Sequence, residues 1–259
     1  IWEFNPPVII EPINRISFNP LFDFLNQINS KRFAKQINIA IDKLGFKDYI
    51  LFNDSSMFLG YYFDELLNYD TYIYYIRDNL IKSINPYWNT QGKRIEAGII
   101  KKADLVVTNS LYYSQYASEF TQHSYMVGQG CDVSLFNDKI REISVPDDLK
   151  DIPKPIIGYV GFLTTKRLSF DILEHMALSH PEWSVVLVGP EDENFQKSKL
   201  HDIKNIYFLG SRNPDELPNY IKGFDICINP QVVNNATIGN YPRKIDEYLA
   251  MGKPVIATK

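Results

Sequence analysis

Lys244 and Glu247 stand three residues apart near the end of the chain, in a stretch with helical periodicity at 243–251 that Gly252 closes. Residues three apart share one face of a helix, so the two side chains can reach the same ligand. A cation near the helix start suits a phosphate, and a carboxylate one turn later suits the hydroxyl groups of a ribose. The pair therefore fits a nucleotide sugar. An ordinary surface ion pair, worth about 0.2–0.5 kcal/mol on a helix, fits it as well, and local chemistry leaves the choice open.

Two further cations, Lys166 and Arg167, lie in a polar loop that follows an apolar segment ending at Gly161. The loop leads into a second stretch with helical periodicity, 170–180. Adjacent cations before a helix suit a diphosphate, and solvated loop charges are the alternative. The loop matches neither the G-x-G-x-x-G pattern nor a Walker loop, which disfavours simple dinucleotide binding and P-loop chemistry.

The second half of the chain predicts the elements that would position these residues. Short segments that are apolar on both faces alternate with helical patterns, which indicates a parallel sheet covered on both sides. In such sheets ligands bind beyond the carboxyl ends of the strands. The predicted strands are 155–161, 183–189, 205–210, 224–229 and 254–258, and the predicted helices are 170–180, 213–222 and 243–251.

The first half repeats this alternation less regularly, with strands predicted at 49–52, 71–76 and 105–108 and helices at 20–28, 33–44, 93–103 and 110–120. The stretch 138–155 carries charges and three prolines with little apolar pattern, as linkers do. The sequence therefore predicts two α/β domains with parallel sheets, an N-terminal one at 1–147 and a C-terminal one at 148–259. The start at Ile1 and the end directly after an apolar strand suggest a fragment, with the N-terminal domain incomplete.

Composition places the chain among globular proteins. Of its 259 residues, 45% are hydrophobic and 22% are charged, and the net charge is −4, which excludes a disordered chain and gives no basic surplus for a nucleic-acid partner. Cys131 and Cys227 have no metal-ligand spacing and fit reduced thiols. No run approaches the ~18 apolar residues of a membrane span, and no signal peptide opens the chain. We expect a cytoplasmic protein, with peripheral contact to the inner membrane left open.

The stretch 242–256, PRKIDEYLAMGKPVI, resembles the P-x-K-x-x-E-Y-L-A-x-G-K-P-V signature of the group 1 glycosyltransferases, which build bacterial surface polysaccharides. Three more segments resemble this family in the same order: ADLVVTNS at 103–110, GCD with a later phenylalanine at 130–136, and the run from PEW at 181 to ELP at 216–218. The resemblance covers residues 70–259 and implies the GT-B fold of two Rossmann-like domains, with the donor bound by the C-terminal one.

The resemblance assigns the donor ribose to Glu247, as the second glutamate of the family's E-x₇-E motif. The first glutamate would stand at position 239, where this chain has Gly239. That departure removes the usual carboxylate contact to the transferred sugar and leaves the donor sugar undefined. Asn235, Thr237 or Asn240 is then available to replace the contact.

For the rest of the donor, the resemblance implies that Lys244 and Lys166 or Arg167 bind the diphosphate beside Gly161. It also implies that backbone groups of three consecutive residues line the base pocket: Gly210, Ser211 and Arg212. Departure of a nucleoside diphosphate builds negative charge on its phosphate oxygens, so fixed cations stabilise the transition state more than the ground state. This gives Lys244 a catalytic as well as a binding role.

A metal ion could stabilise the same charge, but the sequence has no D-x-D triplet, and 191–193 (EDE) is interpreted as a solvated loop. We expect an enzyme that is independent of metal and uses no cofactor besides its nucleotide-sugar substrate. The family resemblance implies retention of anomeric configuration.

On the acceptor side, Asp78 follows the predicted strand 71–76 in a stretch that resembles the Y-Y-x-x-D-N of related enzymes. We expect it to contact the acceptor or the transferred sugar, and a helix cap or turn carboxylate is the alternative. Glu96, in the predicted helix 93–103, is expected to be structural.

The sequence thus predicts a hexosyltransferase that moves a sugar from a nucleotide-diphosphate sugar to a cell-surface polysaccharide or glycolipid. Its partners would be the donor and a glycan or lipid-linked glycan. Two alternatives stay open: a nucleotide-sugar 2-epimerase, which the placement of the four histidines disfavours, and a non-catalytic nucleotide-sugar-binding module, which the missing glutamate at 239 favours.

Overall fold

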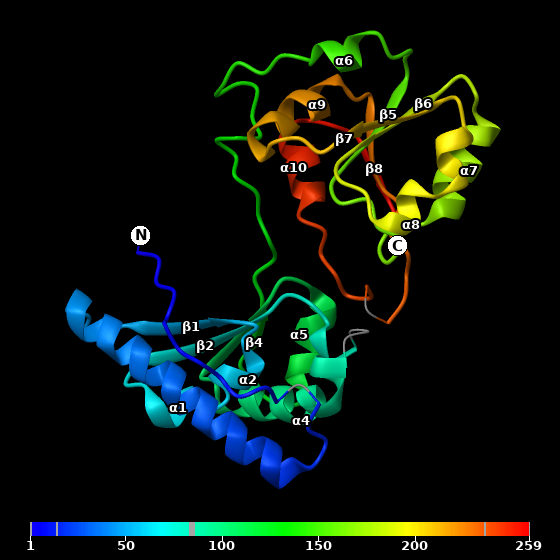
Figure 1. The fold of residues 1–259 in the computed structure, drawn as a ribbon. Coiled ribbons are helices and arrows are strands. Elements are labelled where there is room, and N and C mark those ends of the chain that lie inside the picture. The colour runs from blue at the N-terminus through cyan, green and yellow to red at the C-terminus, as the bar shows by residue number, and fades with distance from the viewer. Residues whose placement is uncertain (1, 14, 83–85, 236, 259) are drawn as a thin grey trace. The chain divides into compact units, whose positions relative to one another are not determined.

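The computed structural model describes residues 2–13, 15–82, 86–235 and 237–258, which form two compact units (Figure 1). The first unit comprises Ile1–Gly128 and Ile238–Tyr241, and the second comprises Gln129–Thr237 and Pro242–Lys259. The division after residue 128 differs from the boundary that the sequence suggested between 147 and 148. Phe136 and Ile143 explain the difference, because both are buried in the core of the second unit.

The sheet of the first unit has four parallel strands in the order β1-β2-β3-β4. They are β1 (Ile50–Asp54), β2 (Thr71–Ile76), β3 (Leu105–Thr108) and β4 (Ser124–Met126). The first three follow the predicted positions. The three residues of β4 were not predicted, because a strand this short shows no periodicity.

The helices of the first unit are α1 (Asn19–Leu44), α2 (Met57–Gly60), α3 (Phe63–Leu66), α4 (Pro86–Lys102) and α5 (Leu111–Ser118), with a 3₁₀ turn at Leu80–Lys82. The two helices predicted at 20–28 and 33–44 are wrong as separate elements, because α1 continues through both. Asn29 lies in the presumed break, but it is buried. Its side chain accepts the backbone N–H of Glu11 at 2.6 Å and donates to the Glu11 carbonyl at 2.9 Å.

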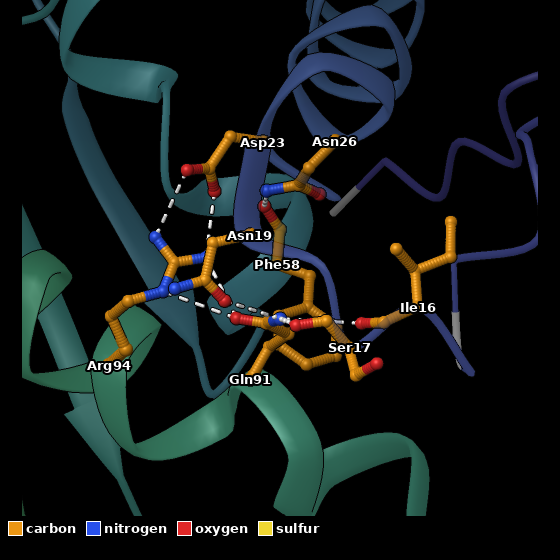
Figure 2. Close-up of polar contacts among 8 residues, drawn as sticks. All are labelled: Ile16, Ser17, Asn19, Asp23, Asn26, Phe58, Gln91 and Arg94. Carbon is orange, nitrogen blue, oxygen red and sulfur yellow. Dashed lines mark hydrogen bonds and ion pairs between the residues drawn. The ribbon is translucent and has the colours of Figure 1, made fainter. Parts of the chain in front are cut away.

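Polar side chains tie α4 to the start of α1 (Figure 2). The buried Gln91 amide donates to the carbonyls of Ile16 and Ser17, at 3.3 and 3.2 Å, and to the Asn19 side chain at 3.0 Å. Its oxygen accepts from the Arg94 guanidinium, which also pairs with both carboxylate oxygens of Asp23. This network fixes the helix that carries Lys93 and Glu96 against the rest of the unit.

The sheet of the second unit has five parallel strands in the order β7-β6-β5-β8-β9 (Figure 1). They are β5 (Ile156–Val160), β6 (Ser184–Val188), β7 (Ile206–Gly210), β8 (Ile226–Asn229) and β9 (Val255–Ala257), and all five were predicted to within two residues at each end. β5 and β6 are buried along their whole length, as expected for strands covered on both faces.

Helices cover the two faces of this second sheet. They are α6 (Asp147–Lys150), α7 (Phe170–Ser179), α8 (Glu193–Gln196), α9 (Leu217–Gly223) and α10 (Lys244–Ala250), with 3₁₀ turns at Lys199–Asp202 and Pro214–Glu216. Alternate residues of β5 enter two separate cores: Ile156 and Val160 one, Ile157 and Tyr159 the other. None of the helices in the described ranges combines the length and the apolar character needed to cross a bilayer.

Candidate functional site

The second sheet changes its direction of winding at β5. From this strand the chain builds outward through β6 and β7 on one side, and later through β8 and β9 on the other. Sheets of this order bind ligands beyond the carboxyl ends of the strands at the point of reversal, here β5 and β8. Near that end of β5, the Val160 N–H donates at 2.8 Å to the hydroxyl of Tyr248, which is fully buried on α10. The strand end and α10 are therefore fixed to each other.

Lys244, the first residue of α10, places its ammonium beside the end of β5. Its Nζ donates a 2.7 Å hydrogen bond to the hydroxyl of Tyr159. Desolvation lowers the pKa of Lys244 to about 8; the charge of Glu247 opposes this shift and that of Arg167 adds to it. In the part of the chain that the structure describes, no carboxylate lies within 4.0 Å of this ammonium. A poorly solvated cation without a counter-ion favours an anionic ligand.

Gly161 leaves the space that the Lys244 ammonium occupies. Its φ is +139°, and a Cβ built on it would lie 2.9 Å from Lys244 Nζ and 3.2 Å from the Tyr159 hydroxyl. A side chain at this position would therefore displace the lysine from the strand end. The predicted grouping of Gly161 with Lys244 is present in the structure.

Glu247 lies one turn further along α10, with only 12% of its side chain exposed. Its carboxylate accepts a 3.2 Å hydrogen bond from Nε of Arg243, whose side chain is 65% exposed. The surface ion pair considered between Lys244 and Glu247 is not formed, because Glu247 pairs with Arg243 and Lys244 with Tyr159. Both residues of the predicted pair are sheltered from open solvent.

The loop after Gly161 is held by its own backbone. The carbonyl of the buried Thr164 accepts the N–H groups of Arg167 and Leu168 at 3.0 and 2.9 Å. The Asp192 carboxylate accepts the Thr165 N–H at 3.2 Å. The side chains of Lys166 and Arg167 are exposed. Hydrogen bonds fix the backbone of the loop that carries them, and both the ammonium and the guanidinium group face solvent.

The acidic triplet 191–193 is occupied with local contacts. Asp192 caps α8 by accepting the Phe195 N–H at 2.8 Å, and hydrogen bonds, chiefly from Thr164, lower its pKa. Glu191 lies 2.8 Å from His201, and Glu193 pairs with Lys197. Across the described residues, no group of three or more His, Cys, Asp or Glu side chains is arranged to hold a metal ion.

The residues predicted for the base pocket begin with Gly210, the last residue of β7, and continue directly after the strand. Gly210 has a φ of +72° and open space where a Cβ would stand, and Ser211 is exposed. The Arg212 guanidinium donates to Asp148 at 2.6 Å and to the Tyr220 hydroxyl, and the bond to Asp148 is the main reason that its pKa is raised. The arginine side chain is therefore engaged, which leaves backbone groups for any ligand, as the resemblance implied.

Asn240 belongs to the first unit, whereas the other residues predicted to bind the donor belong to the second. Its side-chain oxygen accepts a 2.9 Å hydrogen bond from the Tyr113 hydroxyl on α5. The neighbouring Gly239 has a φ of +83°, and a Cβ on it would lie 2.3 Å from the ring of Tyr112. No side chain fits there without a shift, which gives a physical reason for the absence of the family's glutamate.

Of the other two substitutes considered for that glutamate, Thr237 is used within its own turn. It is buried, and its hydroxyl donates to the Val232 carbonyl while its N–H donates to the Asn234 side chain at 3.1 Å. Asn235 is exposed.

Asp78 lies in the first unit, two residues beyond the end of β2. The Asn109 amide holds the adjacent backbone by donating to the Arg77 carbonyl at 2.9 Å. Asp78 lines a cavity of about 460 Å³ together with Tyr113. Burial, and then the Asp78 charge, raise the pKa of that tyrosine. The Asp78 side chain therefore borders a cavity, in addition to any role in the turn after β2.

Two tyrosines of the site were missed from the sequence. Tyr159 looked like an ordinary residue of a buried strand, and no local signal marks it as the partner of Lys244. Tyr248 carried a signal, because it is the tyrosine of the E-Y-L-A stretch, but its role in fixing β5 to α10 appears only in three dimensions.

Comparison with known proteins finds a family match in the C-terminal part of the chain. Residues 154–259 match the family described as "Glycosyl transferases group 1". This match confirms the resemblance to the group 1 glycosyltransferases over that part of the chain.

A curated relative, TuaH of Bacillus subtilis (strain 168), is provisionally named a teichuronic acid biosynthesis glycosyltransferase. It is 29% identical over 174 residues, which are 64% of this chain and 43% of TuaH. The aligned part thus spans less than half the length of that protein.

Solved structures show the same fold. Anabaena HepE in complex with UDP and glucose superposes with a TM-score of 0.63 at 16% identity, over 86% of this chain and 62% of HepE. Sucrose-phosphate synthase from Thermosynechococcus elongatus gives 0.62 at 17% identity, over 87% of this chain and 59% of the synthase. The predicted fold class, two Rossmann-like α/β domains of the GT-B type, is confirmed.

Proposed function

We propose that this chain transfers a hexose from a nucleotide-diphosphate sugar to a cell-surface glycan or a lipid-linked glycan. The observation that carries the proposal is the Lys244 ammonium at the end of β5, which is poorly solvated and has no carboxylate partner among the residues that the structure describes. A diphosphate supplies the missing counter-charge. The presence of a group 1 glycosyltransferase domain and the name of TuaH support the same reading.

In this proposal the donor lies along the carboxyl ends of β5, β7 and β8. Lys244 binds the diphosphate beside Gly161, and Lys166 and Arg167 supply further positive charge from their loop. The sheltered Glu247 carboxylate accepts hydrogen bonds from the ribose hydroxyls. The base contacts backbone groups of three residues: Gly210, Ser211 and Arg212.

The chemistry follows from the position of the cation. As the bond between the anomeric carbon and the diphosphate lengthens, negative charge grows on the phosphate oxygens, and the fixed Lys244 ammonium attracts it more strongly than it attracts the ground state. The cations of the chain carry this charge in the proposal, so we infer independence of added metal. Retention of configuration is inferred from the family resemblance.

The acceptor is assigned to the first unit, where Asp78 lines its cavity and Asn240 is bound to Tyr113. We infer that the reaction takes place in the cytoplasm, with peripheral contact to the inner membrane through a lipid-linked acceptor.

A non-catalytic nucleotide-sugar-binding module is the second candidate. Gly239 favours it, because the close approach of Tyr112 leaves no room for the glutamate that the family uses at that position. A 2-epimerase is disfavoured, because His180 stacks on Trp183 and His201 stacks on Phe208.

A two-stage experiment separates these functions. Thermal unfolding is first measured with UDP-, GDP- and ADP-sugars, since a ligand that binds only the native state raises stability by an amount that grows with the logarithm of its concentration over its Kd. The donor so found is then radiolabelled and incubated with the chain and membrane glycolipid. Transfer supports the enzyme, binding without transfer or hydrolysis supports the module, and absence of any donor binding overturns both.

A further inference from the structure

Arg212 stands two residues beyond the end of β7 and fixes its own segment through its side chain. Its Nε donates to the Tyr220 hydroxyl, one Nη donates to the Asp148 carboxylate at 2.6 Å, and the other donates to the Ser211 carbonyl at 3.3 Å. The Tyr220 hydroxyl in turn donates to the same Asp148 oxygen at 3.1 Å. The arginine, the tyrosine and the aspartate therefore close a ring of hydrogen bonds, which we call the Arg212 ring.

Two helices anchor the Arg212 ring in the core of the second unit. Tyr220 belongs to α9 and is buried in this core. Asp148 belongs to α6, and the next residue, Leu149, is buried in the same core. Because the two anchors belong to packed elements, the guanidinium between them has a fixed position. The Ser211 carbonyl that it contacts is held with it.

The backbone of the segment 210–212 offers two donors to a ligand. The Gly210 carbonyl accepts the Gly189 N–H at 2.9 Å. Within the ranges that the structure describes, the N–H groups of Ser211 and Arg212 have no hydrogen-bond partner. Gly210 has open space where a Cβ would stand, and Ser211 is exposed, so a ligand can reach these two N–H groups. Each base of a nucleotide carries acceptor atoms on its edge that suit such donors.

The exposure of the ion pair argues against a role in stability alone. The side chains of Arg212 and Asp148 are 29% and 38% exposed, and an ion pair in contact with water adds little to the free energy of folding. What the Arg212 ring does fix is the conformation of the segment 210–212. The sequence gave no sign of this, because Asp148 lies in the stretch 138–155, whose composition is typical of a linker.

We propose that Asp148 and Tyr220 are positioning residues for the nucleotide base, because through the Arg212 side chain they hold the two free N–H groups where the base can accept from them. Neither residue touches the ligand, and neither takes part in binding the diphosphate, which belongs to Lys244. The proposal rests on the function proposed above. It extends that function by separating the part of the site that binds the base from the part that binds the diphosphate.

The test compares ligands that carry a base with one that does not. Calorimetry on the full chain measures the affinities of UDP, GDP, ADP and inorganic pyrophosphate. Wild type is compared with Asp148→Ala, with Tyr220→Phe and with the variant that combines both changes. Asp147→Ala is the matched control, because this neighbouring aspartate also belongs to α6 but has a side chain that is 95% exposed and pairs with Lys150.

We expect the nucleotide that wild type binds most tightly to lose about 3- to 10-fold in affinity in Asp148→Ala and in Tyr220→Phe, roughly the effect of one hydrogen bond. Pyrophosphate affinity should stay unchanged in both, and Asp147→Ala should bind every ligand like wild type. The combined variant should lose little more than the more affected single variant, because both changes act through one guanidinium. In NMR spectra, the amide signals of Ser211 and Arg212 should shift with the nucleotide and not with pyrophosphate.

Wild-type nucleotide affinity in both Asp148→Ala and Tyr220→Phe would overturn the inference and leave the proposed function intact. An equal loss of pyrophosphate affinity would also overturn it, because the Arg212 ring would then support the whole site and not the base. If wild type binds none of the three nucleotides, the inference and the proposed function both fail. Should Asp148→Ala not fold, Tyr220→Phe decides alone, since it keeps the aromatic ring in the core.

Discussion

The ammonium of Lys244 and the hydroxyl of Tyr159 are joined by a 2.7 Å hydrogen bond at the carboxyl end of β5. The tyrosine hydroxyl is neutral there, because burial raises its pKa. It therefore orients the lysine without cancelling its charge. A carboxylate in the same place would hold the lysine equally well but would repel a phosphate. The pair thus keeps a positive charge available for an anionic ligand.

Replacing Lys244 with methionine should weaken donor binding, because methionine fills similar space without the charge. A hydrogen bond to a charged group is worth about 1.5–3 kcal/mol, so affinity for the donor should fall about 10- to 100-fold. Isothermal calorimetry with UDP-sugar measures it, with the exposed Lys199→Met as the matched control. Wild-type affinity in Lys244→Met would show that the diphosphate binds elsewhere.

Donor affinity should fall as pH rises through about 8. The folded-state pKa of Lys244 is lowered to about 8 from 10.5, so the ammonium begins to lose its proton there and its attraction for a diphosphate disappears. A calorimetric series between pH 6.5 and 9 measures this decline, and Lys244→Met should flatten it.

The same lowered pKa has a consequence for stability. Below pH 8 both the folded and unfolded states carry the proton, and the folded protein bears the full cost of desolvating it. Between the folded value of about 8 and the unfolded value of 10.5, the unfolded state binds more protons, so this residue's contribution to stability rises with pH. The free energy of unfolding, measured by chemical denaturation, should rise more steeply with pH in wild type than in Lys244→Met across this range. Equal slopes would contradict the lowered pKa of Lys244.

Tyr159→Phe should move the pH dependence of donor binding to lower pH. The variant keeps the ring but removes the oxygen that accepts the ammonium, so the protonated lysine is less stable and its pKa falls further. Tyr207→Phe, in a partly buried position on β7, serves as the control. An unchanged midpoint would mean that the hydroxyl does not stabilise the charged lysine.

Gly239→Ala should destabilise the docking of 238–241 on the first unit. The positive φ disfavours alanine, and the added Cβ would lie 2.3 Å from the Tyr112 ring. We expect a loss of at least about 1 kcal/mol, measured by thermal unfolding or as faster amide exchange at Asn240. Gly130→Ala, where a Cβ meets nothing within 4 Å, should be nearly neutral. Adding Tyr112→Ala should recover part of the loss, and failure to do so would place its cause outside this contact.

Gln91→Leu should lower the free energy of unfolding by about 1–3 kcal/mol, because two backbone carbonyls and one side-chain oxygen lose their donor in a buried place. Urea denaturation measures the change, with the exposed Gln196→Leu as control. A neutral result would show that water replaces the Gln91 amide.

Much of the fold was predictable because it is encoded in local patterns. The five strands of the second sheet are apolar runs bounded by glycine or proline, and α10 sits in a long motif that also signals the family. The prediction failed where polar residues are buried. Asn29 looked like a helix break, yet its amide is satisfied by Glu11, eighteen residues away. The domain boundary shifted because Phe136 and Ile143 are buried in the second core, although Ile143 lies in the stretch 138–155 of linker-like composition.

For the candidate site, the amino-acid sequence indicated the candidate residues, since Lys244, Glu247 and the loop after Gly161 stand in recognisable patterns along the chain. Only the tertiary structure decided what surrounds them. Tyr159 is 85 residues from Lys244 in the chain, and Tyr112 excludes a side chain at Gly239 from a still more distant segment. Spacing along a chain sets which groups share a strand or a helix face, whereas desolvation and partner choice depend on packing between distant segments.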